Sequence, residues 1–476
     1  MDDLGDIKGI EYADPEAPIS YEPFRLDYRM PDWKDAQGRH PYAPPRHYGA
    51  GRLDVQEGYW SRDVAREEWD KLWTRTWHWV GHINDIPEEN CYMRVRLGVE
   101  NILVVRGQGE ELRAFYNVCQ HRGKDLAQND FGRANQLICP FHRWEFNMDG
   151  TLKHIADRET FQAKAVCHNL DIPKVRVEQW RGWIFINLDM DAEPLLNFIP
   201  ADFRAIFDAY DCEKAIRIRD VVQTWPCNWK LAHEAFNEGY HVRATHAQLQ
   251  GAVDPYHCQV NLYDNGFGRS VWQFMTPIAH IADQIGTTID AGLAEEHRIF
   301  LRESGVAEAD FPTDLRDVPK VVVAAKQAKQ GYAIDYSKFT EGQLIDDWSG
   351  GFFPSTEAFF RPEGFFIQHW RAHPNDPEKC IYSAQTYVVP GIHEVPSYFG
   401  VEGEIDLSGK TVIPRDYRPD DDLWAAGPVV SQDMQLLGGV QQGIRSRGFK
   451  GNVLSDQEVR IRQWYDEYAK YMNGLK

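Results

Sequence analysis

Two short segments of this 476-residue chain each combine one cysteine with one histidine. Cys119 and His121 are separated by one residue and Cys139 and His142 by two, with 17 residues (122 to 138) between the pairs. Two thiolates and two imidazoles on two loops are a metal-binding set, so the fold must bring these loops together. Because each loop alternates the two ligand types, the spacing favours a [2Fe–2S] cluster with both cysteines on one iron and both histidines on the other.

Two other interpretations of these four residues remain open. A single zinc ion also accepts two cysteines and two histidines, although a zinc finger normally pairs cysteine with cysteine and histidine with histidine. Four core or surface residues can also fall at this spacing by chance. In the cluster interpretation, two neutral imidazoles replace two thiolates, which raises the reduction potential of the centre.

A second group of metal-binding residues follows the first. We predict a helix over residues 229–240, and on its continuation Glu238 and His241 lie three residues apart and share a face. His246 lies five residues beyond His241, so both histidines reach one metal only if the helix breaks after His241. Two histidines and one carboxylate are the facial triad of non-haem Fe(II) oxygenases, which leaves positions open for O2 and substrate. Each histidine alone is equally compatible with an ordinary buried side chain.

Both groups resemble the metal motifs of ring-hydroxylating Rieske non-haem iron oxygenases. CQHRG (residues 119–123) and CPFHRW (residues 139–144) are similar to the family's two cluster-binding boxes. The stretch from residue 228 to residue 246, which begins Asn-Trp-Lys, is similar to its mononuclear iron motif. The resemblance implies that His241 and His246 are iron ligands.

Glu238 departs from the usual family pattern. The family usually has aspartate at this place, where it links a cluster histidine of one subunit to an iron histidine of the next. Glutamate is one methylene longer but keeps the carboxylate that accepts an imidazole N–H. A minority of the family, including oxygenases of carnitine-like quaternary amines, resembles this chain in having glutamate. We therefore predict that Glu238 is a catalytic bridge that does not ligate iron.

The third iron ligand is expected far downstream. Residues 429–445 have helical periodicity and resemble the family's late helix. On that helix Asp433 shares a stripe with Leu437, Val440 and Ile444, and a carboxylate on an apolar stripe needs a partner such as iron. Alternatively, the helix is amphipathic about another axis and Asp433 is solvated; Glu234 is then the next candidate ligand.

The resemblance implies an α+β fold with two domains. Residues 76–190, rich in short β segments, are expected to form an all-β Rieske [2Fe–2S] domain. Residues 191–476 are expected to form a helix-grip catalytic domain with an antiparallel sheet. Residues 1–75 are expected to be an N-terminal arm and a helix that pack on the catalytic domain.

The activity implied by the resemblance is that of the terminal oxygenase of a multicomponent system. It would use O2 and electrons from NAD(P)H, delivered by a reductase directly or through a ferredoxin, to oxygenate or demethylate a small organic, aromatic substrate. The implied assembly is a homotrimer, or α3β3 with a small subunit. Three other interpretations remain: an electron-transfer protein with an inactive second site, an oxygenase of a non-aromatic substrate such as a quaternary amine, and a zinc-binding structural protein.

Composition narrows the partners and the compartment. The formal net charge of −20 disfavours nucleic acid and anionic lipid as partners. We expect a cytoplasmic protein, because the sequence begins with an acidic segment and has no apolar run long enough to span a membrane. The eight cysteines do not resemble a disulfide framework in a chain of this length.

Two further groups are candidates for substrate and partner binding. Phe236 is predicted to contact substrate, because it precedes the iron-binding histidines; packing within the helix is the alternative. Aromatic residues in later strands are expected to line the cavity or to pack in the core, namely Phe352, Phe353, Phe359, Phe360, Phe365 and Phe366. Basic residues around the cluster boxes form a patch for an acidic redox partner or a scattered charge set, namely Arg122, Lys124, Arg133, Arg143, Lys153 and Arg158.

Overall fold

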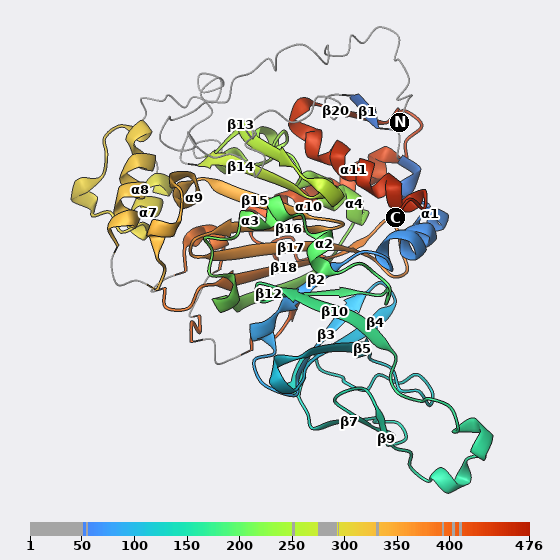
Figure 1. The fold of residues 1–476 in the computed structure, drawn as a ribbon. Coiled ribbons are helices and arrows are strands. Elements are labelled where there is room, and N and C mark those ends of the chain that lie inside the picture. Colours follow the sequence, from blue (N-terminus) through green and yellow to red (C-terminus); the bar gives the residue numbers. More distant parts are fainter. Residues whose placement is uncertain are drawn as a thin grey trace.

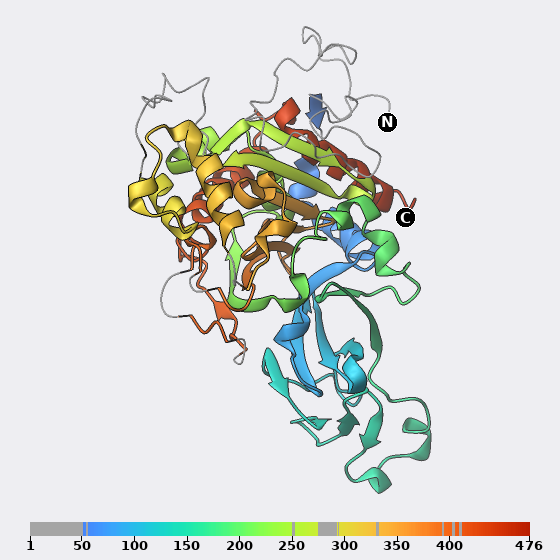
Figure 2. The same ribbon diagram turned by 60° about the vertical axis from the view of Figure 1, so that its left-hand side comes forward.

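The structure is a computed structural model that describes residues 51–53, 56–249, 253–274, 293, 295–329, 333–392, 395–401, 405–408 and 412–476. The arm predicted at the start of the chain lies almost wholly outside these residues. Figure 1 shows a larger part built of helices and strands, with a smaller β-rich part below it. In the turned view the smaller part projects as a narrow lobe (Figure 2). The fold is α+β, as predicted.

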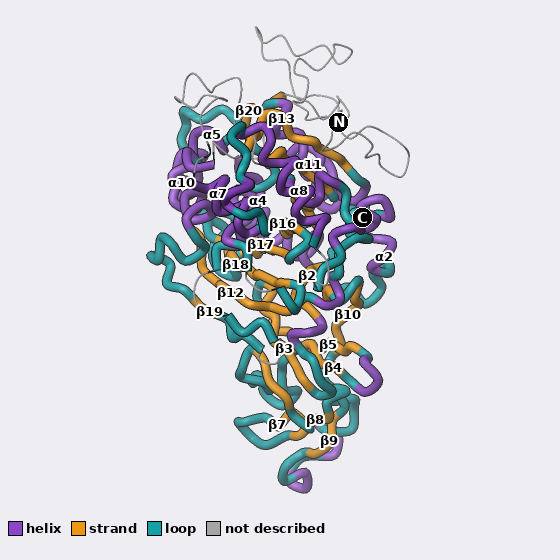
Figure 3. Tube along the Cα trace, turned by 90° about the vertical axis from the view of Figure 1, so that its left-hand side faces the viewer, coloured by secondary structure: helices purple, strands orange, loops and turns teal. Residues whose placement is uncertain are grey.

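The smaller part is built on a seven-stranded sheet. Its order is β2 (His78–His82), β11 (Trp183–Asn187), β10 (Lys174–Trp180), β5 (Leu112–Tyr116), β4 (Glu100–Arg106), β3 (Cys91–Leu97) and β6 (Phe131–Arg133). A three-stranded sheet of β7 (Gln136–Ile138), β8 (Glu145–Asn147) and β9 (Leu152–His154) completes it. Loops dominate the tip beside these three strands (Figure 3).

The larger part contains an eight-stranded sheet. Its order is β13 (Val253–Leu262), β14 (Gly268–Phe274), β15 (Asp347–Phe352), β16 (Thr356–Arg361), β17 (Gly364–Ala372), β18 (Cys380–Val388), β12 (Ile216–Trp225) and β19 (Asp416–Tyr417). All neighbours pair antiparallel except β12 and β19. A fourth, two-stranded sheet joins β1 (Gly51–Leu53) to β20 (Asn452–Leu454).

The described helices belong mostly to the larger part. They are α1 (Arg62–Glu68), α2 (Leu195–Phe198), α3 (Ala201–Ala205), α4 (Trp229–Ala235), α5 (Val242–Thr245), α7 (Glu295–Glu303), α8 (Val318–Ala328), α9 (Glu341–Ile345), α10 (Pro428–Ile444) and α11 (Val459–Met472). α4 packs on β17 and β18, and α10 packs on α4. Among the described helices, none combines the length and the apolar character that a membrane span requires.

Buried charges connect the first helix to the larger part of the chain. Lys230 Nζ lies 2.5 Å from Glu68 Oε1, and both side chains are almost fully buried. The Trp229 indole N–H also donates to Glu68. Because a buried charge is stable only when it is paired, these contacts hold α1 and the following π-helical turn, Trp69–Trp73, against α4.

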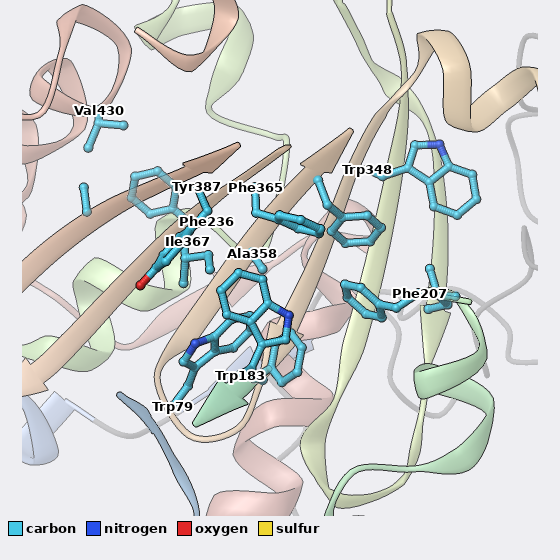
Figure 4. Packing of buried hydrophobic residues seen from close by; sticks show 14 of the residues in the cluster. Trp79, Trp183, Phe207, Phe236, Trp348, Ala358, Phe365, Ile367, Tyr387 and Val430 are labelled. Carbon is cyan, nitrogen blue, oxygen red and sulfur yellow. The ribbon is translucent and has the colours of Figure 1, made fainter. Parts of the chain in front are cut away.

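Aromatic rings join the two parts. Trp79 and Trp183 of the seven-stranded sheet pack on the eight-stranded sheet. The Trp183 ring makes an edge contact with Phe365, with centroids 5.2 Å apart (Figure 4). The Trp79 ring makes a similar contact with Phe352 at 4.8 Å. The Tyr387 hydroxyl of β18 donates to Asp85 in the smaller part at 2.9 Å. The domain boundaries at residues 76 and 190 remain a proposal, supported by the strands of the seven-stranded sheet, which all lie between them.

Several predicted elements form where the sequence placed them. The predicted strand over residues 216–225 is β12, and the turn after Arg361 joins β16 and β17 into a hairpin. The predicted helix over residues 229–240 is too long, because α4 ends at Ala235. Its end is fixed by Asn237, whose side-chain amide donates to the His233 carbonyl at 2.9 Å and so satisfies an acceptor that a further helical turn would have used.

Candidate metal centres and active site

The two cysteine-containing loops of the smaller part have the same backbone design. In each, the cysteine N–H donates to the carbonyl five residues later, and the N–H four residues later donates to the cysteine carbonyl, at 2.8 to 3.0 Å. The residue four places after Cys119 is Gly123 and that after Cys139 is Arg143, and both have left-handed backbones with φ of 76° and 56°. Two such matched loops present their cysteine and histidine side chains in equivalent ways.

The side chains of these loops fit a [2Fe–2S] cluster. Cys119 and Cys139 are 2% and 1% exposed, and their thiols lie close enough to interact. The His121 and His142 rings have centroids 4.6 Å apart, and the Nδ1 atom of each is buried with no hydrogen-bond partner in the described part of the chain. A buried ring nitrogen without a partner is costly unless a metal takes its lone pair. The two buried thiols and the two buried Nδ1 atoms are therefore suitable ligands for iron held between the loops.

The early end of α4 positions the two histidines that are predicted to bind iron. After Ala235 the chain turns, and His241 becomes the residue that precedes the short helix α5. His246 follows the last residue of that helix. The helix therefore breaks before His241 rather than after it, and the four-residue α5 places the two rings side by side.

His241, His246 and Asp433 form one compact group of metal-binding atoms. The His241 and His246 Nε2 atoms are 3.3 Å apart. Asp433 Oδ1 lies 3.5 Å from the first and 3.2 Å from the second. Among the described residues, this is the group of histidine, cysteine and acidic side chains whose atoms are close enough to share one ion. Two imidazoles and one carboxylate in a triangle of this size fit a mononuclear iron.

Two side chains orient the histidines of this group. Glu238 Oε1 lies 2.5 Å from His241 Nδ1, and its other oxygen accepts the His241 backbone N–H at 3.1 Å. Gln432 Oε1 lies 2.8 Å from His246 Nδ1. When each Nδ1 carries the proton, each Nε2 keeps its lone pair for the metal. Burial lowers the pKa of His241, but the Glu238 and Asp433 carboxylates outweigh burial and raise it.

Asp433 is carried on the buried face of α10, and its side chain is 4% exposed. The predicted stripe is wrong at one position, because Val440 is 45% exposed. Gln441 is buried in its place, since its side chain accepts the Asn228 N–H and donates to the Tyr59 carbonyl. These two bonds satisfy a polar residue on the inner face, so the face cannot be recognised from apolar residues alone.

Glu234, the alternative candidate for the third iron ligand, lies outside the group formed by His241, His246 and Asp433. Its Oε1 accepts the hydroxyls of Tyr59 and Tyr465 at 2.8 and 2.6 Å. Burial raises the pKa of Glu234 to about 7, although these hydroxyls and Lys230 act to lower it. The carboxyl is therefore a structural group shared by α4, α11 and the segment before α1.

Replacing Glu234 with glutamine is expected to change how stability depends on pH. Between about pH 4.5 and pH 7, the folded protein keeps a proton on Glu234 that the unfolded chain has released. The free energy of unfolding therefore falls as pH rises through this range, and glutamine removes that loss. From about pH 5 to about pH 8, Glu234→Gln should gain about 2.5 kcal/mol relative to wild type in denaturant unfolding. Parallel pH profiles for the two proteins would contradict the assignment.

An apolar cavity of about 330 Å³ lies against the iron-binding group. Phe236 lines it together with the two histidines and Asp433, so the structure places the predicted substrate contact beside them. Of the six phenylalanines from the later strands, Phe359, Phe360 and Phe366 line the cavity. Phe352, Phe353 and Phe365 pack in the core instead.

The six basic residues predicted around the cluster loops are all exposed. Arg133 pairs with Glu88, and Lys153 donates to Gln136. Phe141, in the second loop, is 55% exposed, and the Arg122 guanidinium lies 5.2 Å from its ring centroid. An exposed ring beside exposed cations, near the histidines predicted to bind the cluster, is a surface that another protein can contact.

Comparison with known proteins identifies the family. The model for the catalytic domain of ring hydroxylating alpha subunits matches residues 207–474, and the Rieske [2Fe–2S] domain model matches residues 76–172. The chain therefore belongs to the alpha subunits of the Rieske ring-hydroxylating oxygenases. This family carries a Rieske cluster and a mononuclear non-haem iron.

Individual relatives cover part of the chain. The carnitine monooxygenase oxygenase subunit of Acinetobacter baumannii is 31% identical over 200 residues, which are 41% of this chain and 53% of that protein. The biphenyl 2,3-dioxygenase alpha subunit of Rhodococcus jostii is 30% identical over 228 residues, 47% of this chain and 48% of the relative. The chain thus spans about half the length of the curated relatives it matches.

Solved structures share the fold over nearly the whole chain. A quaternary ammonium Rieske monooxygenase bound to L-carnitine superposes with a TM-score of 0.62 at 19% identity, over 95% of this chain and 99% of the other. Naphthalene 1,2-dioxygenase with indole in its active site gives a TM-score of 0.61 at 18% identity, over 91% and 94%. At these identities the likeness concerns the fold.

Proposed function

We propose that this chain is the terminal oxygenase component of a multicomponent Rieske oxygenase, which hydroxylates or demethylates a small organic substrate with O2. The observation that carries the proposal is the triangle of His241, His246 and Asp433 atoms at the wall of an apolar cavity. An electron carrier needs a cluster but no such triangle beside a substrate-sized space. A zinc structural site needs neither the cavity nor a second set of ligands.

Two separate sets of side chains would hold the two metal centres. Cys119, His121, Cys139 and His142 would hold the [2Fe–2S] cluster on the two matched loops. His241, His246 and Asp433 would hold the mononuclear iron, which when bound supplies O2 activation. Glu238 and Gln432 keep the two imidazoles in the tautomer and orientation that ligation requires.

The cavity wall binds substrate and excludes water. Phe236 is 8% exposed and packs on Trp370 with ring centroids 4.8 Å apart, so its position is fixed before substrate arrives. Phe359 and Phe366 face the same space from β16 and β17. Rigid apolar walls hold a substrate in one pose, which lowers the entropic cost of reaction.

Electrons reach the chain from a separate reductase, directly or through a ferredoxin, with NAD(P)H as their source. The exposed cations beside the cluster loops support docking of an acidic carrier on a protein whose net charge is −20. We propose assembly as a homotrimer or as α3β3, in which the cluster of one subunit serves the iron of the next. Glu238 would connect the two centres across that boundary.

Metal analysis tests the proposed function on the purified full-length chain. The expected protein is red-brown, with acid-labile sulfide matching two irons per chain and one further iron. Nitric oxide, a surrogate for O2, should give the high-spin iron–nitrosyl signal from that further iron. Iron in the cluster alone would leave an electron carrier, and a colourless zinc protein would overturn both assignments.

Glu238→Gln should retain both metal centres but lose electron transfer between them. The amide keeps an oxygen for His241 Nδ1–H and removes the negative charge, so neither centre loses a ligand. We expect reoxidation of the reduced cluster, in the presence of O2 and a compound that wild type oxidises, to slow by about 100-fold. Rapid-mixing absorbance of the cluster measures this rate.

Two further variants make that experiment specific. Glu238→Asp shortens the reach by one methylene and should recover part of the rate. Glu234→Gln replaces a buried carboxyl that contacts tyrosines rather than histidines, so its rate should match wild type. A wild-type rate in Glu238→Gln would show that Glu238 is not the bridge.

A further inference from the structure

Among the described residues, the cavity beside the iron-binding group contains one cation that forms no ion pair. Apart from the metal-binding triad, its charged residues are Arg219, Arg361 and Asp347. Arg361 Nη2 lies 3.2 Å from Asp347 Oδ1, so this pair is internally neutral. Arg219 therefore carries the unbalanced charge of the wall.

Arg219 is held in place by backbone groups. Its guanidinium donates to the Ala425 carbonyl at 2.8 Å and weakly to the Gly400 carbonyl at 3.4 Å. Within the part of the chain that the structure describes, no carboxylate lies within ion-pairing distance of it. Burial lowers the pKa of Arg219 and outweighs the Asp416 carboxylate, which acts to raise it. Asp416 itself pairs with Arg418 at 2.6 Å. A partly buried guanidinium without an anion is costly, and a bound anion relieves that cost.

A second donor lies on the same wall. Gln368 is 1% exposed, and its side-chain oxygen accepts the Tyr382 hydroxyl at 2.7 Å. This bond directs the amide nitrogen elsewhere, and Nε2 has no partner among the described residues. Tyr382 itself is fixed by stacking on Trp225 with ring centroids 4.1 Å apart. A buried N–H group without an acceptor on a cavity wall needs one from a ligand.

We propose that the substrate of this chain is an organic anion, whose carboxylate or sulfonate pairs with Arg219 while its apolar body lies between that residue and the iron-binding group. The inference rests on the proposed function, and it adds the substrate class. The aromatic rings bind the body, and Arg219 with Gln368 supplies N–H donors for acceptor atoms. A plain hydrocarbon would leave the Arg219 charge unpaired.

The charged residues of the cavity wall also disfavour a simple quaternary amine as the substrate. A cation in this cavity would meet the unbalanced Arg219 charge, and the carboxylate that could attract it, Asp347, is already paired with Arg361. The repulsion is strong in an apolar site, where little water screens it. A zwitterion fits only if its anionic end reaches Arg219.

Three probes of one shape test the inference. They are naphthalene-2-sulfonate, the neutral methyl 2-naphthyl sulfone and the cationic 2-naphthyltrimethylammonium ion. Sulfonate is chosen because it is a poor iron ligand, so its binding reports on Arg219 and not on the metal. Binding to the iron-loaded protein without O2 is followed by quenching of tryptophan fluorescence, since Trp272 lines the cavity. We expect the sulfonate to bind about tenfold to 100-fold more tightly than the sulfone, and the cation least tightly.

Two arginine variants separate direct contact from general charge. Arg219→Met keeps the length of the side chain and should abolish the preference for the sulfonate without weakening sulfone binding. Arg445→Met removes a cation that pairs with Glu378 and does not line the cavity, and it should keep the preference. An unchanged preference in Arg219→Met, or tighter binding of the sulfone or the cation by wild type, would overturn the inference.

Failure of the inference and failure of the proposed function give different results. If the further iron is absent but the sulfonate preference depends on Arg219, the cavity binds anions and the oxygenase proposal is wrong. If the iron–nitrosyl signal is present and the preference is absent, the oxygenase proposal stands and the substrate class is wrong.

Discussion

Replacing Cys139 with serine is expected to bleach the visible spectrum of the protein and abolish turnover. The thiol is 1% exposed and lies beside Cys119, so it faces the space that the cluster would occupy. A serine hydroxyl does not supply the thiolate that Rieske iron requires. Absorbance and acid-labile sulfide of the purified variant measure the loss.

Cys167→Ser is the matched control for this prediction. Cys167 belongs to the same domain but is exposed, and its thiol donates to the Lys164 carbonyl. This variant should retain the full cluster spectrum. Cys139→Ser should still bind the mononuclear iron and give the iron–nitrosyl signal, because none of that iron's ligands has changed. A normal Rieske spectrum in Cys139→Ser would refute the ligand assignment.

Local sequence patterns were sufficient to predict those elements whose structure depends mainly on their own residues. The predicted strand over residues 216–225 has the bounds of β12, and the turn between β16 and β17 lies at the predicted Pro-Glu-Gly signal. The cluster motifs are equally local, because each loop carries two ligands within four residues. Such features depend on turn chemistry and alternation, which are visible in sequence.

Features that depend on distant residues could not be predicted in the same way. The end of α4 is set by the Asn237 side chain, which competes with the next helical turn. Gln441 is buried on α10 because its partners lie in other segments of the chain. Gln432 was not recognised as a partner of His246, since 186 residues separate them. Its position immediately before Asp433 was the available signal.

The cavity charges illustrate the same limit. Arg361 and Arg219 have the same chemistry in sequence, but one is paired with Asp347 and the other with backbone carbonyls. Which of two arginines is available to a ligand depends on tertiary contacts. The proposed substrate class therefore depends on how the strands place these arginines around the cavity, which local sequence patterns do not show.

Asp433→Ala is expected to release the mononuclear iron and leave the Rieske cluster intact. Asp433 Oδ1 lies within 3.5 Å of both histidine Nε2 atoms and is the carboxylate of the triangle. Loss of a ligand should reduce turnover by more than about 100-fold, since loss of a supporting residue alone costs about 10- to 100-fold in metal affinity or activity. Iron analysis should show one iron fewer per chain, with an unchanged visible spectrum and no iron–nitrosyl signal.

Two variants on the same helix make that result specific. Gln435→Ala changes an exposed residue of α10 and should keep both iron and activity. Gln432→Ala removes the acceptor of His246 Nδ1 and should weaken iron binding about 10- to 100-fold without abolishing it. Metal titration of the chelator-treated proteins would order the three variants. If Asp433→Ala kept its iron and its nitrosyl signal, the carboxylate of the triad would lie elsewhere in the chain, because a facial triad with its carboxylate removed cannot hold the metal in the same coordination.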